Sequence, residues 1–170
     1  KQYEFNCTNL IPVNMYGPHD NFQPWSSHVI PALILKIDRA IDRQHKEIEL
    51  WGTGKASREF LYVNDCAEAI AKSLKADTDP HPINIGTGEE ITIRDLVESL
   101  QEIMGYDGEI TFNPNYPDGQ PRRCLDTNKA HHALGFQAVT DLRKGLKDTI
   151  DWYYQNKQKE KFVDYFDHIQ

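Results

Sequence analysis

The chain has 170 residues, of which 39% are hydrophobic and 11% aromatic, so it is long enough to form one domain with an ordinary core. Its 26 acidic residues outnumber its 19 basic residues and give a net charge of -7. Proteins that bind the phosphate backbone of nucleic acids normally carry basic stripes. We therefore expect one compact globular unit without a nucleic-acid partner.

The cysteines and the apolar segments limit the cellular setting. Cys7, Cys66 and Cys124 are widely spaced and form no C-x-x-C pair, which argues against a disulfide framework and against a bound metal. We expect a reducing, cytoplasmic setting, with Cys7 in a strand and Cys66 on a helix as small buried residues. The apolar run at residues 29–35 is too short for the roughly 20 residues of a membrane span, and no signal peptide is visible. A start at Lys1 without methionine is consistent with a truncated chain.

The first half of the chain alternates strands and helices. Residues 5–11 predict a strand that runs into a turn-rich loop at residues 12–24. Apolar residues at helical spacing predict a helix over residues 28–43, capped by Ser26 or Ser27. Strands are expected at residues 47–51 and 59–63, followed by a helix that Asn64 or Asp65 caps and that ends near residue 75. The face of this helix that we expect to be buried consists of Ala67, Ile70, Ala71 and Leu74.

The second half continues the same alternation. A strand at residues 83–85 ends in a glycine turn, and a helix from residue 93 begins at Thr92, which with Asp95 resembles a capping box. Gly105 is expected to end that helix in the left-handed conformation. Strands follow at residues 109–112 and 124–126, with helices at 127–134 and 141–154. The sequence therefore predicts a small α/β domain, with residues 156–170 as a tail or docking segment.

Five segments in order carry a resemblance. They read PVNMYGPHDNF from Pro12, SHVIPAL from Ser27, WGTGKASREFLYVND from Trp51, INIGTGEEITI from Ile83 and PDGQPRRCLD from Pro117. Together they resemble the C-terminal part of the extended short-chain dehydrogenases that act on nucleotide sugars, in particular the GDP-L-fucose synthases. The resemblance implies a Rossmann-type α/β fold whose N-terminal nucleotide-binding half is absent. Residues 1–18 would then end the dinucleotide-binding sheet, residues 19–155 would form the substrate-binding domain, and 156–170 the tail.

This family converts GDP-4-keto-6-deoxy-D-mannose to GDP-L-fucose by epimerisation at C3 and C5 and NADP-dependent reduction at C4. A proton beside a ketone can be removed because the carbonyl holds the resulting charge as an enolate, and inversion needs a base on one face and an acid on the other. The resemblance assigns the base to a cysteine of the missing half and the acid to His28, whose ordinary pKa of about 6.5 suits proton transfer near neutrality. A simpler alternative is that His28 only begins a helix, with its ring bonded to a carbonyl.

The resemblance also assigns residues to the substrate. Arg58 and Arg123 stand where the family places an arginine and a lysine on the GDP sugar, and Lys36 stands where arginine is usual. Arginine can hold two phosphate oxygens at once, so these exchanges keep the charge but change the hydrogen-bond geometry. Lys36 could also be solvated surface. Trp51 corresponds to a tryptophan that packs on the substrate, although packing in the core is an equal alternative.

The cofactor NADP(H) is expected mainly in the missing half. The resemblance assigns Pro12, Val13, Asn14 and Met15, with His28, to the nicotinamide side, and Val13 replaces the usual threonine. The missing half should also carry the catalytic tyrosine and lysine of a Tyr-x-x-x-Lys pair, so the chain alone is expected to be inactive. The family is commonly dimeric, so a homodimer is expected at full length.

Other signals are weaker. The Gly86-x-Gly88 pair lacks the third glycine of a dinucleotide loop, because Ile91 occupies that position, so we interpret it as a turn. His131 and His132 are adjacent on a predicted helix, point in different directions and are expected at the surface. Two other functions stay open. The chain could belong to another nucleotide-sugar epimerase or dehydratase, or form a non-catalytic module that binds nucleotide sugars.

Overall fold

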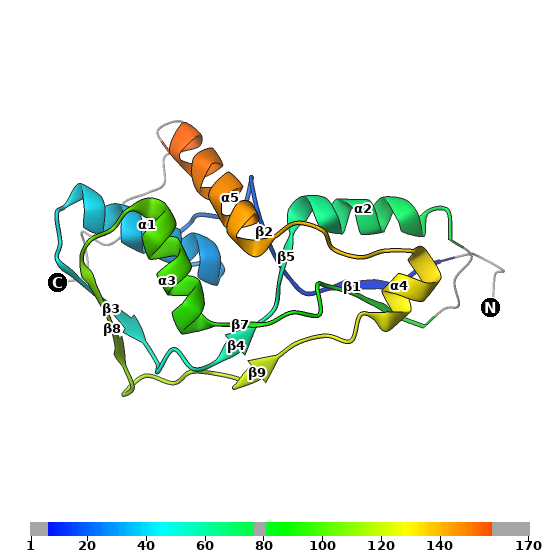
Figure 1. Cartoon of the computed structure of the whole chain (residues 1–170), viewed down its shortest axis with the longest axis horizontal. Helices are drawn as coiled ribbons and strands as arrows, with labels where there is room; N and C mark the ends of the chain where they lie inside the picture. Colours follow the sequence, from blue (N-terminus) through cyan, green and yellow to red (C-terminus); the bar gives the residue numbers. More distant parts are fainter. Residues whose placement is uncertain (1–6, 77–80, 158–170) are drawn as a thin grey trace.

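The computed structural model describes residues 7–76 and 81–157 and confirms the α/β class. The molecule is elongated, with α2 and α4 at one end and α1, β3 and β8 at the other (Figure 1). In chain order the elements are β1 (Leu10–Pro12), β2 (Asn14–Tyr16), α1 (Val29–Asp42), β3 (Glu47–Trp51), β4 (Ser57–Arg58), β5 (Phe60–Tyr62), α2 (Val63–Ser73), β6 (Ile83–Ile85), β7 (Ile91–Thr92), α3 (Ile93–Met104), β8 (Glu109–Asn113), β9 (Arg122–Arg123), α4 (Asn128–Leu134) and α5 (Leu142–Asn156). Within the described ranges, none of these helices has the length and apolar character that a membrane span requires.

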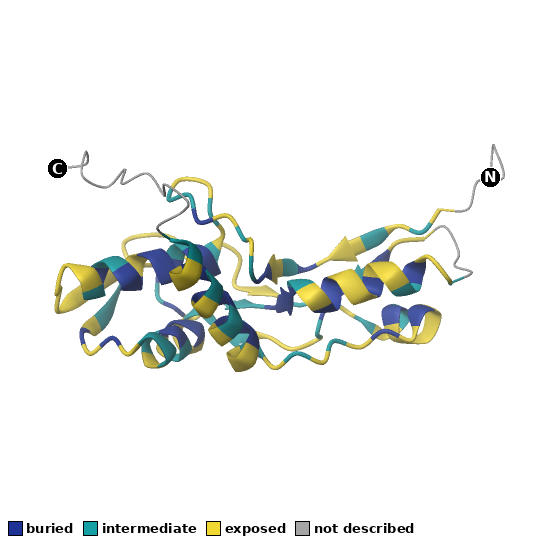
Figure 2. Cartoon of the chain, turned by 90° about the horizontal axis from the view of Figure 1, so that it is seen from above, coloured by how far each residue is buried: buried dark blue, intermediate teal, exposed yellow. Residues whose placement is uncertain are grey.

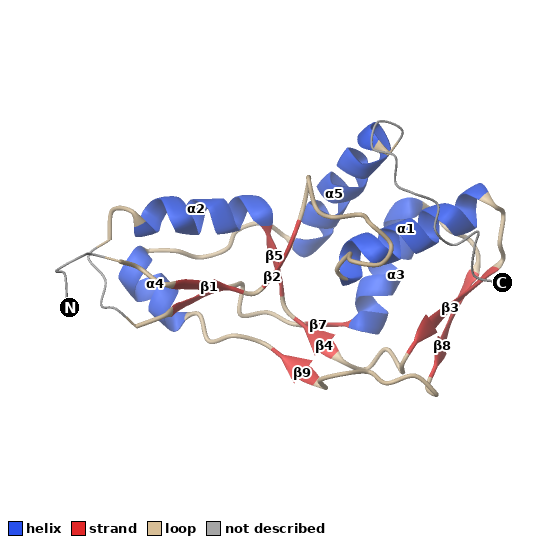
Figure 3. Cartoon of the chain, turned by 180° about the vertical axis from the view of Figure 1, so that it is seen from behind, coloured by secondary structure: helices blue, strands red, loops and turns tan. Residues whose placement is uncertain are grey.

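The strands form small sheets rather than one large sheet (Figure 3). The pairs β1–β6, β2–β5 and β3–β8 are parallel, and β4 lies between antiparallel β7 and parallel β9. The strands expected at residues 47–51 and 59–63 are therefore present, but they belong to different sheets. Parallel partners must be distant in the sequence, because a parallel connection needs a crossover.

The larger hydrophobic core lies between α1, α3 and α5. α1 presents Ile30, Ile34 and Ile37 on one face, and Leu100 of α3 and Leu146 of α5 meet them in the same cluster. All five side chains are almost completely buried. This packing explains the helical spacing of apolar residues that predicted α1, because that spacing places them in one stripe that faces α3 and α5.

A second, smaller core lies beneath α2 and α4, around β1 and β6. The described residues thus hold two hydrophobic clusters, and α2 and α4 cover the smaller one. The predicted buried face of α2 is wrong. The buried face contains Cys66, Ala69 and Ser73, while Leu74 is 83% exposed. Because α2 follows β5 without a loop, the strand fixes which side of the helix faces inward. The side expected to be buried, which holds Ala67, Ile70, Ala71 and Leu74, is the exposed one, and Figure 2 shows it as yellow bands.

The helix termini confirm some predicted caps and correct others. The Thr92 hydroxyl accepts a hydrogen bond from the Asp95 N–H at 3.1 Å, and Gly105 has the predicted left-handed conformation. The residue at the start of α1 is His28, not Ser26 or Ser27, and its side chain makes no capping bond. The serines instead belong to the preceding loop, which turns before the helix begins.

Three further predictions change at the ends of elements. Tyr62, not Asn64 or Asp65, precedes α2, since β5 continues directly into the helix. The strand expected at residues 124–126 is β9 at residues 122–123, where it pairs with β4. Cys66 is buried as expected, but Cys7 is exposed and precedes β1, so that prediction is wrong because the strand begins later. α5 extends to Asn156, and residues 158–170 of the expected tail lie outside the described part of the chain.

Candidate active site

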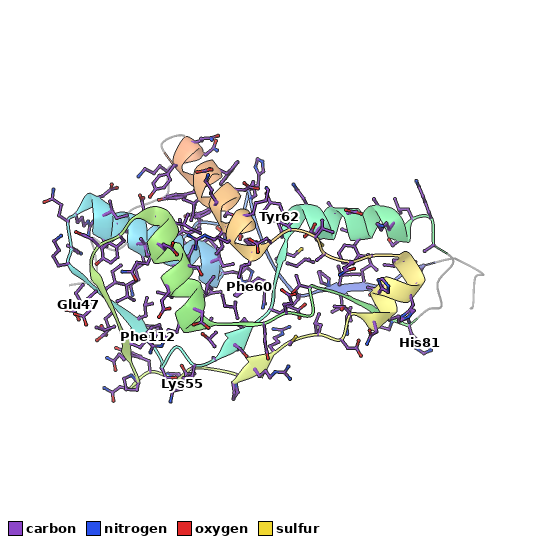
Figure 4. All side chains as sticks on the ribbon, in the orientation of Figure 1. Glu47, Lys55, Phe60, Tyr62, His81 and Phe112 are labelled. Carbon is purple, nitrogen blue, oxygen red and sulfur yellow. The ribbon has the colours of Figure 1, made fainter. Side chains whose placement is uncertain are left out.

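Two adjoining cavities meet at His28. The first, of about 490 Å³, is lined by residues 12–21 together with His28, Val63 and Arg123. The second, of about 320 Å³, is lined by residues that include His28, Arg58, Phe60 and Asp118. Asn14 and Met15 line both cavities, and Phe60, labelled in Figure 4, marks the position of the second. The fold therefore brings together three predicted site residues that are far apart in the sequence: His28, Arg58 and Arg123.

His28 is an exposed residue at the start of α1. Its ring makes no hydrogen bond within the described part of the chain, so the carbonyl-bonded alternative is not observed. Asp20, which the sequence interpretation missed, lines the first cavity beside it. Burial raises the pKa of Asp20, and the Asn21 N–H and the nearby His28 act in the opposite direction. One carboxylate oxygen of Asp20 is buried without a partner among the described residues.

The loop that carries Asp20 is anchored on α5. The Phe22 ring is almost completely buried and stacks on Tyr153, with ring centres 4.9 Å apart. His19 has a left-handed backbone with a φ of 69°, and its ring lies 4.9 Å from that of Trp152. These contacts fix the approach to His28, so α5 contributes to the site although it supplies no side chain to the two cavities.

Arg58 and Arg123 lie side by side. They are direct partners in the parallel register of β4 and β9, and side chains at paired positions emerge on the same face of a sheet. Ser57 and Arg122 form the neighbouring pair on the opposite face, where the Arg122 Nε donates to Glu90 at 2.8 Å. No ion pair joins Arg58 or Arg123 to a carboxylate within the described residues. Arg123 lines the first cavity and Arg58 the second, and two adjacent guanidinium groups where the cavities adjoin suit a bound anion with several oxygens.

Asp118 closes the second cavity from the loop before β9. Its carboxylate accepts hydrogen bonds from the Thr53 N–H and hydroxyl, both at 2.6 Å. These bonds hold the pKa of Asp118 below its ordinary value. Gly52 must be glycine because its φ is 83° and a side chain would meet the Asp118 carboxylate. The Pro-Asp-Gly turn was the available sequence signal for this bridge.

Trp51 and Lys36 lie outside the two cavities. Trp51 is 69% exposed, which excludes the core-packing alternative, and it stacks on Tyr116 with ring centres 4.7 Å apart. The Lys36 ammonium donates to the Glu49 carbonyl at 2.6 Å and lines a separate cavity between α1 and β3. Burial lowers the pKa of Lys36, and the charge of Glu49 partly offsets the effect. The structure does not bring either residue next to His28.

The segment expected on the nicotinamide side forms one wall of the first cavity. Pro12, Val13, Asn14 and Met15 all line it. The Val13 side chain points into the smaller core and its N–H donates to the Ile85 carbonyl at 2.9 Å. Met15 is half-exposed and faces the opening. The four residues of this wall are uncharged, which suits a flat, neutral ring.

The glycine turn after β6 is confirmed as structural. The backbone N–H groups of Thr87 and Gly88 donate to the Glu59 carboxylate at 2.7 and 2.8 Å, so they are not free to bind a phosphate. His131 and His132 are exposed, as expected. In residues 7–76 and 81–157 no cluster of side chains could hold a metal ion.

A Tyr-x-x-x-Lys spacing does occur in the chain, at Tyr153 and Lys157, and was missed in the sequence. The structure places both on buried Asp38 of α1: the Tyr153 hydroxyl donates at 2.6 Å and the Lys157 ammonium lies at 2.9 Å. Burial is the main cause that raises the pKa of Tyr153, and Asp38 raises it further. A catalytic phenol needs the opposite shift. The pair therefore fastens α5 to α1, and it lies outside both cavities.

Comparison with known proteins agrees with this architecture. The family described as "NAD dependent epimerase/dehydratase family" matches residues 1–86, and the chain belongs to it. It is 40% identical over 155 residues to GDP-L-fucose synthase 1 of Arabidopsis thaliana, covering 91% of this chain and 48% of the relative. It is 37% identical over 168 residues to GDP-L-fucose synthase of Escherichia coli strain K12, covering 94% of this chain and 52% of the relative.

Among solved structures, a GDP-L-fucose synthetase of Naegleria fowleri bound to NADP superimposes with a TM-score of 0.83 at 27% identity, covering 91% of this chain and 48% of that one. The resemblance to GDP-L-fucose synthases is thus confirmed for sequence and fold. The chain spans about half the length of the curated relatives it matches.

Proposed function

We propose that this chain is the substrate-binding part of an NADP-dependent epimerase and reductase that converts GDP-4-keto-6-deoxy-D-mannose to GDP-L-fucose. The observation that carries the proposal is the meeting of His28, Arg58 and Arg123 at two adjoining cavities. The similarity to GDP-L-fucose synthases supports the same substrate class. Residues 1–18 would complete the nucleotide-binding sheet, and residues 19–155 would hold the sugar nucleotide.

In this proposal Arg58 and Arg123 bind the diphosphate. Their paired positions on β4 and β9 put two planar cations on one face, each able to hold two oxygens. Each such charge-assisted contact contributes about 1.5–3 kcal/mol, so two suffice to orient the nucleotide. Trp51 presents a large exposed face to the base or sugar, and Lys36 completes the nucleotide end if α1 and β3 close around it.

His28 then acts as the acid of the two epimerisations. The base in the missing half removes a proton beside the ketone, and the imidazolium of His28 returns a proton to the opposite face of the enolate. Asp20 lies in the same cavity as His28 and is a second group that the proton transfer could involve. The uncharged wall at residues 12–15, with His28, fits the nicotinamide of NADP(H), which would supply the hydride for C4 while the missing half holds most of the cofactor.

Three further expectations rest on the resemblance alone. The full-length protein would be a homodimer in the cytoplasm, and this chain would show no turnover by itself. Oxidation of NADPH by this chain with the keto sugar would overturn the last expectation.

The test uses the full-length protein in D₂O. We expect deuterium at both C3 and C5 of the product, and we expect His28→Asn to reduce the rate of deuterium uptake by about 100-fold or more while GDP binding is retained. His131→Asn is the matched control, since His131 is exposed on α4, and should change nothing. Uptake at only one carbon, or at neither, would favour another nucleotide-sugar epimerase or dehydratase. Binding of GDP without conversion of the keto sugar to any product would favour a non-catalytic module.

A further inference from the structure

Glu59 is a completely buried carboxylate between β4 and β5, with 0% of its surface exposed. Its two oxygens accept three backbone N–H groups: those of Thr87 and Gly88 at 2.7 and 2.8 Å, and that of Leu125 at 2.7 Å. A buried charge is costly unless it is hydrogen-bonded, and three charge-assisted bonds from distant segments provide that compensation. The residue therefore joins its own segment to the Thr87–Gly88 turn and to the segment that follows β9.

Two of these parts border the candidate active site, while the Thr87–Gly88 turn lines neither of its cavities. Arg58 directly precedes Glu59, and Arg123 lies two positions before Leu125. The Glu59 carbonyl accepts the Asn14 side-chain amide at 3.1 Å, and Asn14 lines both cavities. One residue thus contacts the segments that carry both arginines and the wall of the first cavity.

The ladder between β4 and β9 is too short to fix the arginines by itself. It consists of two residue pairs, Ser57 with Arg122 and Arg58 with Arg123. Beyond Arg123 the next anchor of this segment to the core is the Leu125 N–H bond to Glu59. The segment is also held by the Ser57 N–H bond to the Pro121 carbonyl at 2.9 Å, by the ion pair of Arg122 with Glu90 on the other face, and by the Asn84 amide bond to the Asp126 carbonyl at 3.2 Å. Of the backbone bonds beyond Arg123, the one from Leu125 to Glu59 lies nearest to it.

We propose that Glu59 is a positioning residue, which holds Arg58 and Arg123 side by side so that both reach one diphosphate. This inference rests on the proposed function for its ligand. A carboxylate is required because both oxygens accept, whereas a glutamine has one oxygen and one N–H₂ donor. In Glu59→Gln the amide donor must face either Leu125 or the Thr87–Gly88 pair, and one set of bonds is lost. Gly86 is part of the same arrangement, since a side chain there would meet the Glu59 carboxylate.

The experiment compares Glu59→Gln with Glu90→Gln in this chain. Glu90 binds Arg122 on the opposite face of the same sheet, so its variant loses a charge without touching the proposed link. Nitrogen relaxation of the Arg58 and Arg123 Nε–H groups reports their order, and isothermal titration reports GDP affinity. We expect Glu59→Gln to increase the mobility of both guanidinium groups and to weaken GDP binding about tenfold. Glu90→Gln should leave both guanidinium groups ordered and affinity within twofold.

Each result decides between the proposals. Unchanged mobility of Arg58 and Arg123 in folded Glu59→Gln refutes the positioning role, whatever happens to GDP. Absence of GDP binding by the unaltered chain refutes the proposed function, while the relaxation data still decide the role of Glu59. If Glu59→Gln does not fold, Gly86→Ala displaces the carboxylate while keeping its charge, and the same two measurements apply. Ordered arginines and full affinity in Gly86→Ala would equally overturn the inference.

Discussion

Replacing Tyr153 with phenylalanine removes one hydroxyl from the buried contact between α5 and α1 and keeps the ring stacked on Phe22. The lost interaction is the 2.6 Å hydrogen bond to Asp38, whose carboxylate is 4% exposed and also binds Lys157. A hydrogen bond to a charged group contributes about 1.5–3 kcal/mol, and the carboxylate that remains cannot regain it from water. We therefore expect the free energy of unfolding to fall by about 2 kcal/mol.

For a domain of about 150–250 residues each kcal/mol shifts the melting temperature by about 2–4 °C, so a decrease of about 4–8 °C is expected. Urea unfolding followed by tryptophan fluorescence measures the change in midpoint. Tyr116→Phe is the matched control, because the Tyr116 hydroxyl makes no hydrogen bond within the described residues, and its stability should be unchanged.

The same variant tests the interpretation of the Tyr-x-x-x-Lys spacing. In the full-length protein, turnover should stay within about twofold of the unaltered enzyme below the melting temperature. A loss of roughly 100-fold to 10,000-fold, the contribution of a general acid, would show that Tyr153 is catalytic. A melting temperature unchanged by the substitution would refute the structural reasoning.

Four further substitutions test other contacts. Leu100→Ala removes a completely buried side chain and should lower the free energy of unfolding, measured in urea, by about 2–5 kcal/mol. Leu74→Ala, on the exposed face of α2, should lower it by less than about 0.5 kcal/mol. Equal effects of the two variants would contradict the assigned core. Leu74→Lys should leave this chain folded but weaken its association with the complementary half, measured by co-purification; full association would exclude α2 from that interface. Since the bonds from Thr53 lower the pKa of Asp118, their stabilisation should be complete above the ordinary pKa near 3.8 and lost as the pH falls through the lower folded value. Asp118→Asn should flatten that part of the acid unfolding curve, and an unchanged curve would contradict the bridge.

The elements with strong local signals were predictable from sequence. α1 follows from its apolar spacing, and α3 follows from the capping box at Thr92 and from Gly105 at its end, because these features act within a few residues. The inward face of α2 was not predictable, since both sides carry small or apolar residues and the choice depends on how β5 enters the helix. Sequence could not indicate which end of the molecule holds which core.

The candidate site shows the same limit. His28, Arg58 and Arg123 were found through motifs, but their meeting depends on the pairing of β4 with β9, two short strands far apart in the sequence. Glu59 was missed because a lone glutamate before a strand is normally solvated, and only its three donors reveal it as buried. The partners of Tyr153 and Lys157 lie on a helix more than a hundred positions earlier, so the spacing alone could not show their role.

The most direct test of the account is a titration of this chain with GDP, comparing Arg123→Ala with Arg122→Ala. The two residues are neighbours on β9 with side chains on opposite faces, so charge and position are closely matched. We predict that Arg123→Ala weakens binding by about 10-fold to 100-fold, the loss of one charge-assisted contact of about 1.5–3 kcal/mol, and that Arg122→Ala stays within about twofold. Equal losses in the two variants, or no binding of GDP by the unaltered chain, would contradict the claim that the paired arginines form the substrate site.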